Sequence, residues 1–215
     1  EKTSSPVTLI MINSKLERAG LVVDLPPEKE VHSEEIPDEI LRSGRVFFTD
    51  MVPVKASIDA VKRCRKMNIP VAFDLQMAAE HVNVVNHNRY IAIIYEMSDI
   101  FFSDIENFCL WRGTMDLDSA ILEVQKEKPH LLLVITKGHS GSMIVSESCR
   151  IQIPAFSVPV VDTIGAGDAF HGAFLFAYLI MQMNLKAAGL FASATAALSC
   201  RAAGARDALP GFQKS

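Results

Sequence analysis

Apolar residues alternate along the chain between short runs and longer stretches with helical spacing. Four short runs have the composition of strands: Arg45–Thr49, Pro70–Asp74, Ile100–Ser103 and Leu131–Thr136. Three amphipathic stretches separate them: Val54–Met67, Asn88–Met97 and Asp116–Lys128. The alternation of strand and helix predicts an α/β fold, a mostly parallel doubly wound sheet with helices on both faces.

The beginning of the chain has a different pattern. Two apolar runs, Thr8–Asn13 and Leu21–Asp24, flank a polar turn around Lys15–Gly20. This arrangement is typical of a β-hairpin. A loop rich in Pro and Glu follows from Leu25 to Pro37, and we expect either a surface connection or a mobile flap there.

Polar residues follow the predicted strands. In open parallel sheets, ligands bind at the carboxyl ends of the strands. The segments found there are Asp50, Asp74, Asp104, the Lys137–Gly141 turn and the stretch Asp162–Asp168. We expect the functional site among them.

The stretch Val158–Asp168 is expected to end a strand and to open a helix. Gly165 and Gly167 let the backbone bend tightly and approach a ligand. The amides of Ala166, Gly167 and Asp168 would then lie at the helix N-terminus, where they can bind an anion. The helix dipole would favour the ionised form of Asp168, which could accept a proton. The simpler interpretation is a tight turn capped by an aspartate.

Composition limits the class of protein. The chain has 215 residues, of which 49% are hydrophobic and 21% charged, and a formal charge of −4, which gives no basic excess for nucleic acid. The spacing of the four cysteines does not match a zinc site. We expect them to be free thiols and the protein to be cytoplasmic. The longest apolar run, Ala173–Met183, is too short to cross a membrane, so we expect no membrane partner. The lack of a basic excess likewise leads us to expect no nucleic-acid partner.

The motif Asp162-Thr-x-Gly-Ala-Gly-Asp168, followed by a helix of small residues, resembles the hallmark of the ribokinase-like (PfkB-type) carbohydrate kinases. The resemblance implies Asp168 as the catalytic base, with Gly165, Ala166 and Gly167 forming the anion hole. It also implies nucleotide-binding roles for a further set of residues: Thr136, Gly138 and Gly141 in a strand-turn-strand segment, Ser193 beside the adenine, and Asp104 and Asn107 near the phosphates.

The implied activity is transfer of a phosphoryl group from ATP to a hydroxyl of a small sugar or nucleoside-like substrate. Mg²⁺ would be bound mainly through phosphates and water, with no set of side-chain ligands, and the family also allows a monovalent cation near Asp162 and a homodimer. Relatives usually have Asn-x-x-Glu where this chain has Asp104-Ile-Glu-Asn107. This exchange leaves open an alternative, a catalytically degraded nucleotide- or sugar-binding regulatory or interaction protein on the same scaffold.

The resemblance covers the C-terminal two-thirds of the family fold. Residues 1–30 would be a lid hairpin with its connection, and residues 31–215 a nucleotide-binding and catalytic α/β domain. The N-terminal third of the family fold, with its substrate motif, is absent, so we expect little or no activity from this chain alone. No role is predicted for His171, which is expected to be a packed helix residue.

Overall fold

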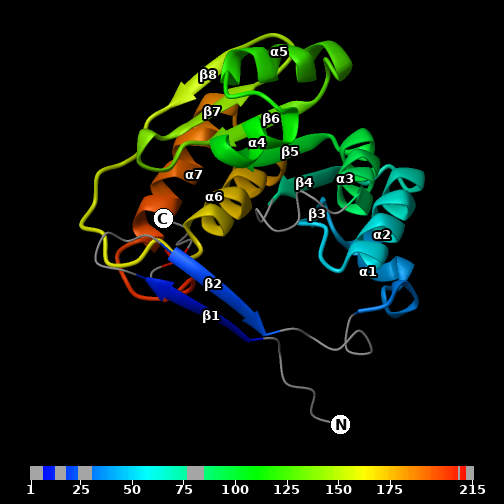
Figure 1. Cartoon of the computed structure of the whole chain (residues 1–215), viewed down its shortest axis with the longest axis horizontal. Coiled ribbons are helices and arrows are strands. Elements are labelled where there is room, and N and C mark those ends of the chain that lie inside the picture. The colour runs from blue at the N-terminus through cyan, green and yellow to red at the C-terminus, as the bar shows by residue number, and fades with distance from the viewer. Residues whose placement is uncertain (1–6, 13–17, 24–30, 77–84, 208, 212–215) are drawn as a thin grey trace.

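The computed structural model describes residues 7–12, 18–23, 31–76, 85–207 and 209–211 (Figure 1). Strands β1 (Val7–Ile12) and β2 (Arg18–Val23) form an antiparallel two-stranded sheet. The predicted hairpin is therefore present, although its second strand begins earlier than expected. Asn13, Asp24 and part of the predicted turn lie outside the described residues.

A six-stranded sheet in the order β3-β4-β5-β6-β7-β8 forms the centre of the molecule. Its strands are β3 (Phe47–Thr49), β4 (Val71–Leu75), β5 (Ile100–Asp104), β6 (Leu132–Thr136), β7 (Ser142–Val145) and β8 (Arg150–Ile153). The pairs from β3 to β6 are parallel, and β7 and β8 continue the sheet antiparallel. The expected mostly parallel sheet is confirmed.

Helices connect the strands. They are α1 (Asp38–Ser43), α2 (Val54–Lys66), α3 (Val85–Met97), α4 (Ile105–Arg112), α5 (Leu117–Glu127), α6 (Ala166–Leu175) and α7 (Leu185–Ser199). Short turns of other types are η2 (Ser33–Glu35), η3 (Gly138–Ser140) and the π-helical turn η4 (Phe176–Ile180), which extends α6. The structure confirms the three helices expected between the strands and adds α1 and α4.

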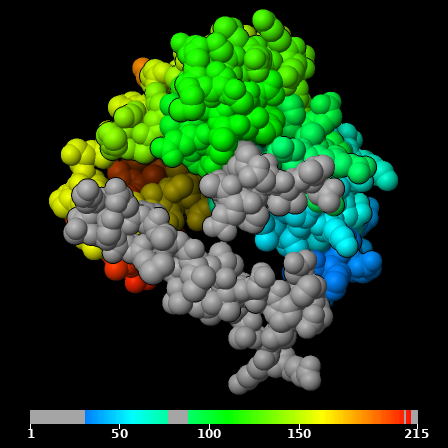
Figure 2. Space-filling model, in the orientation of Figure 1, coloured from blue at the N-terminus to red at the C-terminus, as the bar shows by residue number. Residues whose placement is uncertain are grey.

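The two faces of the sheet have separate cores. Phe101 packs with α2, α3, α4 and α5, whereas the next residue, Phe102, packs with α6 and α7. Successive strand residues point to opposite faces, so an apolar strand such as β6 is buried on both. In space-filling view, helices α1 and α2 and the region of α4 and α5 form one continuous surface (Figure 2).

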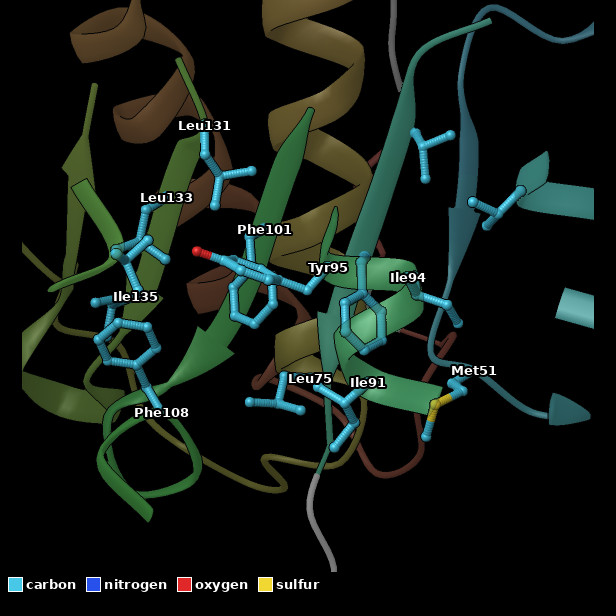
Figure 3. Close-up of a cluster of buried hydrophobic side chains, with 14 of the residues drawn as sticks. Met51, Leu75, Ile91, Ile94, Tyr95, Phe101, Phe108, Leu131, Leu133 and Ile135 are labelled. Carbon is cyan, nitrogen blue, oxygen red and sulfur yellow. The ribbon is translucent and has the colours of Figure 1, made fainter. Parts of the chain in front are cut away.

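Aromatic rings fill the first of these cores. Figure 3 shows Phe101 close to Tyr95, with Phe108 and Ile135 on the same side of the sheet. The ring centroids of Phe101 and Tyr95 are 5.7 Å apart in an edge-to-face arrangement, a favourable geometry for aromatic pairs. This core fixes β4 and β5, whose carboxyl ends carry Asp74 and Asp104.

The prediction of a strand before Asp168 is wrong. Residues 154–165 have no regular secondary structure, and α6 begins only at Ala166. Pro154 and Pro159 lack the N–H that a strand ladder requires. The N–H groups of Val161 and Asp162 instead donate to the carbonyl of Cys200, at 2.8 and 3.2 Å.

Candidate active site

Polar side chains from three parallel strands meet at the carboxyl edge of the sheet. Asp104 is paired in register with Thr136 of β6, and Asp74 lies one strand away on β4. Asp50 follows β3 directly, and the charges of Asp50, Asp104 and Asp168 all act on Asp74. The structure thus brings the predicted strand-end aspartates together with the start of α6.

The start of α6 is built on Gly165. This residue is the helix N-cap and has a φ of 76°, in the left-handed region where glycine is favoured. A Cβ at this position would lie 2.6 Å from the Cβ of Ala205. Only glycine can therefore connect the preceding loop to α6 without displacing the loop around Ala205.

The first turn of α6 presents backbone donors. The Ala166 N–H donates to the Thr163 carbonyl at 3.3 Å, whereas Gly167 and Asp168 lie where the helix itself offers no acceptor. A Cβ on Gly167 would meet no atom within 4 Å, so the space beside its backbone is open. The helix therefore starts at the glycines, as predicted, whereas binding of an anion to these amides stays a prediction.

Asp162 connects this turn to the chain after α7. Its carboxylate accepts from the N–H of Ile164 and of Gly204, both at 2.9 Å. Two segments that lie far apart in the sequence are therefore held side by side at the start of α6. Whether a monovalent cation binds near Asp162 stays a prediction.

The pKa of Asp168 is raised, mainly because surrounding protein excludes water from one side of the carboxyl and further because Asp50 repels its charge. The helix N-terminus was expected to favour the ionised form, but these two effects outweigh it. A raised pKa moves a carboxylate closer to the range in which a general base is most effective.

The sequence placed Asp74 at the end of a strand and His171 on a helix, but it did not reveal that the two meet. Asp74 is 3% exposed, and burial is the main cause that raises its pKa to about 7. His171, which was expected only to pack, is 5% exposed and lies with its Nδ1 3.4 Å from the Asp74 Oδ2. Only the fold, which packs α6 across β4, brings these residues together.

A cavity of about 840 Å³ opens beside Asp168. It lies between α6, α7 and residues 205–206 and 209–211, and its lining includes Asp168, Gly172, Phe176, Phe191, Thr195 and Leu209. Its size falls within the range of small-molecule sites, and most of its lining is apolar. Asp168 was a predicted site residue, as was Gly165, which also lines the cavity, whereas none of the other lining residues named here was singled out from the sequence.

The turn between β6 and β7 follows Thr136. Gly138 and Gly141 both have positive φ, at 52° and 85°. A Cβ on Gly141 would lie 2.1 Å from the carbonyl oxygen of Ile153, so glycine is required where this turn meets the end of β8. A Cβ on Gly138 would meet no atom within 4 Å. The role of Gly138 in nucleotide binding stays a prediction.

Ser193 has a structural partner. Its hydroxyl donates to the carbonyl of Pro154 at 2.7 Å, which connects α7 to the segment after β8. The cavity is lined by the next residues of α7, Ala194 and Thr195, and not by Ser193. The predicted contact of Ser193 with adenine therefore stays a prediction.

Asp104 begins α4. It accepts a hydrogen bond from the Asn107 N–H at 2.8 Å, and the Asn107 side-chain amide also donates to it. These hydrogen bonds make Asp104 the N-cap of α4. The carboxylate at this position belongs to Asp104, and the amide of Asn107 is held against it.

Within the described part of the chain, no group of three or more His, Cys, Asp or Glu side chains is arranged to hold a metal ion. No helix there is long and apolar enough to cross a membrane. The described cysteines are free thiols.

Fold and site define an α/β protein of the ribokinase type. The structure resembles a fructokinase from Vibrio cholerae O395, solved with fructose, ADP and calcium ion, with a TM-score of 0.77, 19% identity and coverage of 96% of this chain and 70% of that one. It also resembles aminoimidazole riboside kinase from Salmonella enterica, solved with aminoimidazole riboside and an ATP analog, with a TM-score of 0.74, 22% identity and coverage of 94% and 70%.

The chain belongs to the pfkB family of carbohydrate kinases, whose family model matches residues 1–211. The bifunctional ribokinase/ribose-5-phosphate isomerase A of Fructilactobacillus sanfranciscensis is 35% identical over 189 residues, which are 86% of this chain and 33% of that protein. The chain spans only 27% to 50% of the length of three further curated relatives.

Proposed function

We propose that the full-length protein transfers the γ-phosphoryl group of ATP to a hydroxyl of a small sugar or nucleoside-like substrate. The observation that carries the proposal is the first turn of α6, where Asp168 and the open amides of Gly167 and Asp168 stand beside a cavity of about 840 Å³. Membership of the pfkB family and relatives named for sugar and riboside kinases support it.

Asp168 would take the proton of the substrate hydroxyl as that oxygen attacks the phosphorus. The raised pKa of Asp168 suits this role, because a base with a pKa nearer neutrality accepts a proton more readily. The backbone amides from Gly165 to Asp168 would stabilise the charge of the transferring group. Mg²⁺, bound mainly through phosphates and water, would neutralise the phosphate charge.

The nucleotide would extend from α6 toward the turn after β6. Asp104 and Thr136 are register partners at the same sheet edge, and Gly138 and Gly141 follow. Roles for Asp104, Asn107 and Ser193 in nucleotide binding, a homodimer, and a lid function of the hairpin β1–β2 remain predictions of the family resemblance.

Replacing Asp168 tests the proposal. Asp168→Asn in the full-length protein should retain Mg·ATP binding and lower kcat by about 10²–10⁴-fold, because only proton acceptance is removed. Coupled assays of ADP release with a panel of sugars and nucleosides, together with calorimetric titration of Mg·ATP, measure both quantities. Asp116→Asn is a matched control, since Asp116 caps α5 and asparagine caps helices equally well.

An unchanged kcat in Asp168→Asn would remove Asp168 from the mechanism. A second candidate is a nucleotide- or sugar-binding protein without turnover, which is favoured by the use of the Asp104 carboxylate as a helix cap bound to Asn107. Binding of Mg·ATP with no phosphoryl transfer to any hydroxyl substrate would support this second candidate.

A further inference from the structure

Two buried polar side chains behind Asp168 have no part in the proposed phosphoryl transfer. His171 follows Asp168 on α6 by about one helical turn and points into the sheet, where it is 5% exposed. Asp74, on β4, is 3% exposed. Buried ionisable groups of this kind are held in proteins only with a partner or in the neutral form.

His171 lacks an ordinary partner. Both of its ring nitrogens are buried and make no hydrogen bond to any described residue. Its neighbours are aromatic, with the ring centroid of Phe102 at 4.5 Å and that of Phe48 at 6.0 Å. The polar group that faces the imidazole is the Asp74 carboxyl, whose Oδ2 lies 3.4 Å from Nδ1.

Asp74 is surrounded by negative charge. Asp168 on α6, Asp50 after β3 and Asp104 at the end of β5 all repel an ionised Asp74, whereas the Gln76 amide donates to its Oδ2 at 2.8 Å. Burial is the largest influence on both partners. It raises the pKa of Asp74 to about 7 and lowers the pKa of His171 to about 4, so below neutral pH a proton belongs on the carboxyl.

We propose that Asp74 and His171 are positioning residues that hold one proton between them and thereby set the charge behind Asp168. In the protonated pair, the Asp74 O–H donates to the Nδ1 of a neutral His171, which gives this nitrogen the partner that it lacks. When the proton leaves to solvent, the pair carries one negative charge. That charge adds to those of Asp50, Asp104 and Asp168 at the edge of the sheet.

The consequence for nucleotide binding rests on the proposed function. If the phosphates of ATP bind at the first turn of α6, an added negative charge behind this turn weakens their binding. The affinity of the full-length protein for Mg·ATP should therefore fall as the pair loses its proton. The pair would couple nucleotide affinity to pH without contacting the nucleotide.

NMR spectroscopy of the full-length protein labelled in histidine tests the pair directly. The His171 signal is assigned by its loss in His171→Asn, and its Nδ1 shift is followed from about pH 5 to about pH 9. We expect a neutral ring whose Nδ1 shift changes with an apparent pKa of about 7, as Asp74 releases its proton. This change should be lost in Asp74→Asn, whereas His130→Asn, at an exposed histidine, should leave it intact.

An Nδ1 signal that titrates identically in the wild type and in Asp74→Asn overturns the proposal. If Asp74→Asn does not fold, the carboxyl carbon signal of Asp74 gives an equivalent test in His171→Phe, which keeps a ring in place. The pKa of Asp74 should then fall, because the protonated carboxyl loses its acceptor. An unmoved pKa in this variant overturns the proposal as well.

Calorimetry with Mg·ATP measures the functional consequence. Between about pH 6 and about pH 8.5, the dissociation constant of the wild type should rise about threefold to tenfold more than that of Asp74→Asn. Equal pH dependence in the two proteins contradicts an influence of the pair on the nucleotide. Absence of ATP binding in every protein contradicts the proposed function instead, and the NMR titration still decides whether the pair exists.

Discussion

Gly165 and Gly167 lie two residues apart, yet the structure gives them different tasks. Gly165 has a left-handed backbone and touches Ala205, so it is required for the turn itself. Gly167 is helical, and the space where its Cβ would stand is empty. The first glycine therefore serves the fold, and the second leaves room for a ligand beside the backbone.

Alanine at each position separates these tasks. Gly165→Ala should lower the free energy of unfolding by about 1–3 kcal/mol, because alanine is strained at this φ and displaces Ala205. Gly167→Ala should leave stability unchanged or raise it by about 0.4–1 kcal/mol, since it reduces the freedom of the unfolded chain. It should nevertheless weaken Mg·ATP binding, because its methyl group occupies the approach to the amides.

Urea unfolding and calorimetry of the two full-length variants measure these effects. Wild-type affinity for Mg·ATP in Gly167→Ala would mean that the first turn of α6 does not hold phosphates. In that case the glycines would be features of a tight turn alone, as the simpler interpretation of the sequence suggested.

The sequence predicted the local start of α6 better than the environment of its side chains. Asp168 and its glycines are close together in the chain, so their motif alone indicated a helix start with open amides. The contact between Asp74 and His171 joins residues on β4 and α6, and only the folded sheet reveals it. The raised pKa of Asp168 was missed for the same reason, because burial and the charge of Asp50 come from tertiary structure.

Among the helices, α4 depends on a side chain that also carries charge toward the proposed phosphate site. Asp104 caps α4 through the N–H of Asn107 and stands beside Thr136 at the sheet edge. Asparagine can provide the same cap without the charge, whereas alanine removes both. The two substitutions therefore distinguish the structural from the electrostatic role of Asp104.

We expect Asp104→Ala to lower the free energy of unfolding by about 0.5–2 kcal/mol through loss of the cap. Asp104→Asn should leave stability almost unchanged and should tighten binding of ATP in the absence of Mg²⁺, because one negative charge is removed near the phosphates. Urea unfolding and calorimetry in the presence of a chelator measure the two quantities. Equal ATP affinity in wild type and Asp104→Asn would place Asp104 away from the phosphates.

Periodicity predicted the regular elements well where burial is uniform. The parallel strands and α2, α3 and α5 follow directly from apolar spacing, because each buries one stripe or both faces against the same sheet. It missed α1, which spans only Asp38–Ser43 and buries a single residue, Leu41. It also predicted a strand before Asp168, where the backbone instead binds the Cys200 carbonyl.

At the scale of the whole molecule, folding changes proton binding at two buried groups in opposite directions. Burial raises the pKa of Asp74 from 3.8 to about 7, so the folded protein keeps a proton that the unfolded chain releases. Burial lowers the pKa of His171 from 6.5 to about 4, so the folded protein lacks a proton that the unfolded chain binds. Each group therefore makes stability depend on pH.

The two dependences oppose one another. The stability that Asp74 contributes is fully present below pH 3.8 and is lost as the pH rises through about 7. The stability that His171 contributes is present above pH 6.5 and is lost as the pH falls through about 4. Between about pH 4 and pH 6.5, folding therefore releases one proton at His171 and binds one at Asp74, and the two slopes cancel.

Single substitutions should uncover each slope. Relative to the wild type, Asp74→Asn should lose stability as the pH falls from about 7 to 3.8, because the contribution of Asp74 is missing. Relative to the wild type, His171→Phe should lose stability as the pH rises from about 4 to 6.5, because the contribution of His171 is missing. Each slope can reach about 1.4 kcal/mol per pH unit, and urea unfolding of the full-length proteins at several pH values measures it.

The sign of the difference between the two variants is the decisive result. All other titrating groups are shared, so they cancel when each variant is compared with the wild type at the same pH. His130→Asn is the matched control, because it removes an exposed histidine that contacts Glu147 and neither member of the buried pair. Parallel slopes in Asp74→Asn and His171→Phe would mean that these buried side chains do not exchange protons oppositely on folding.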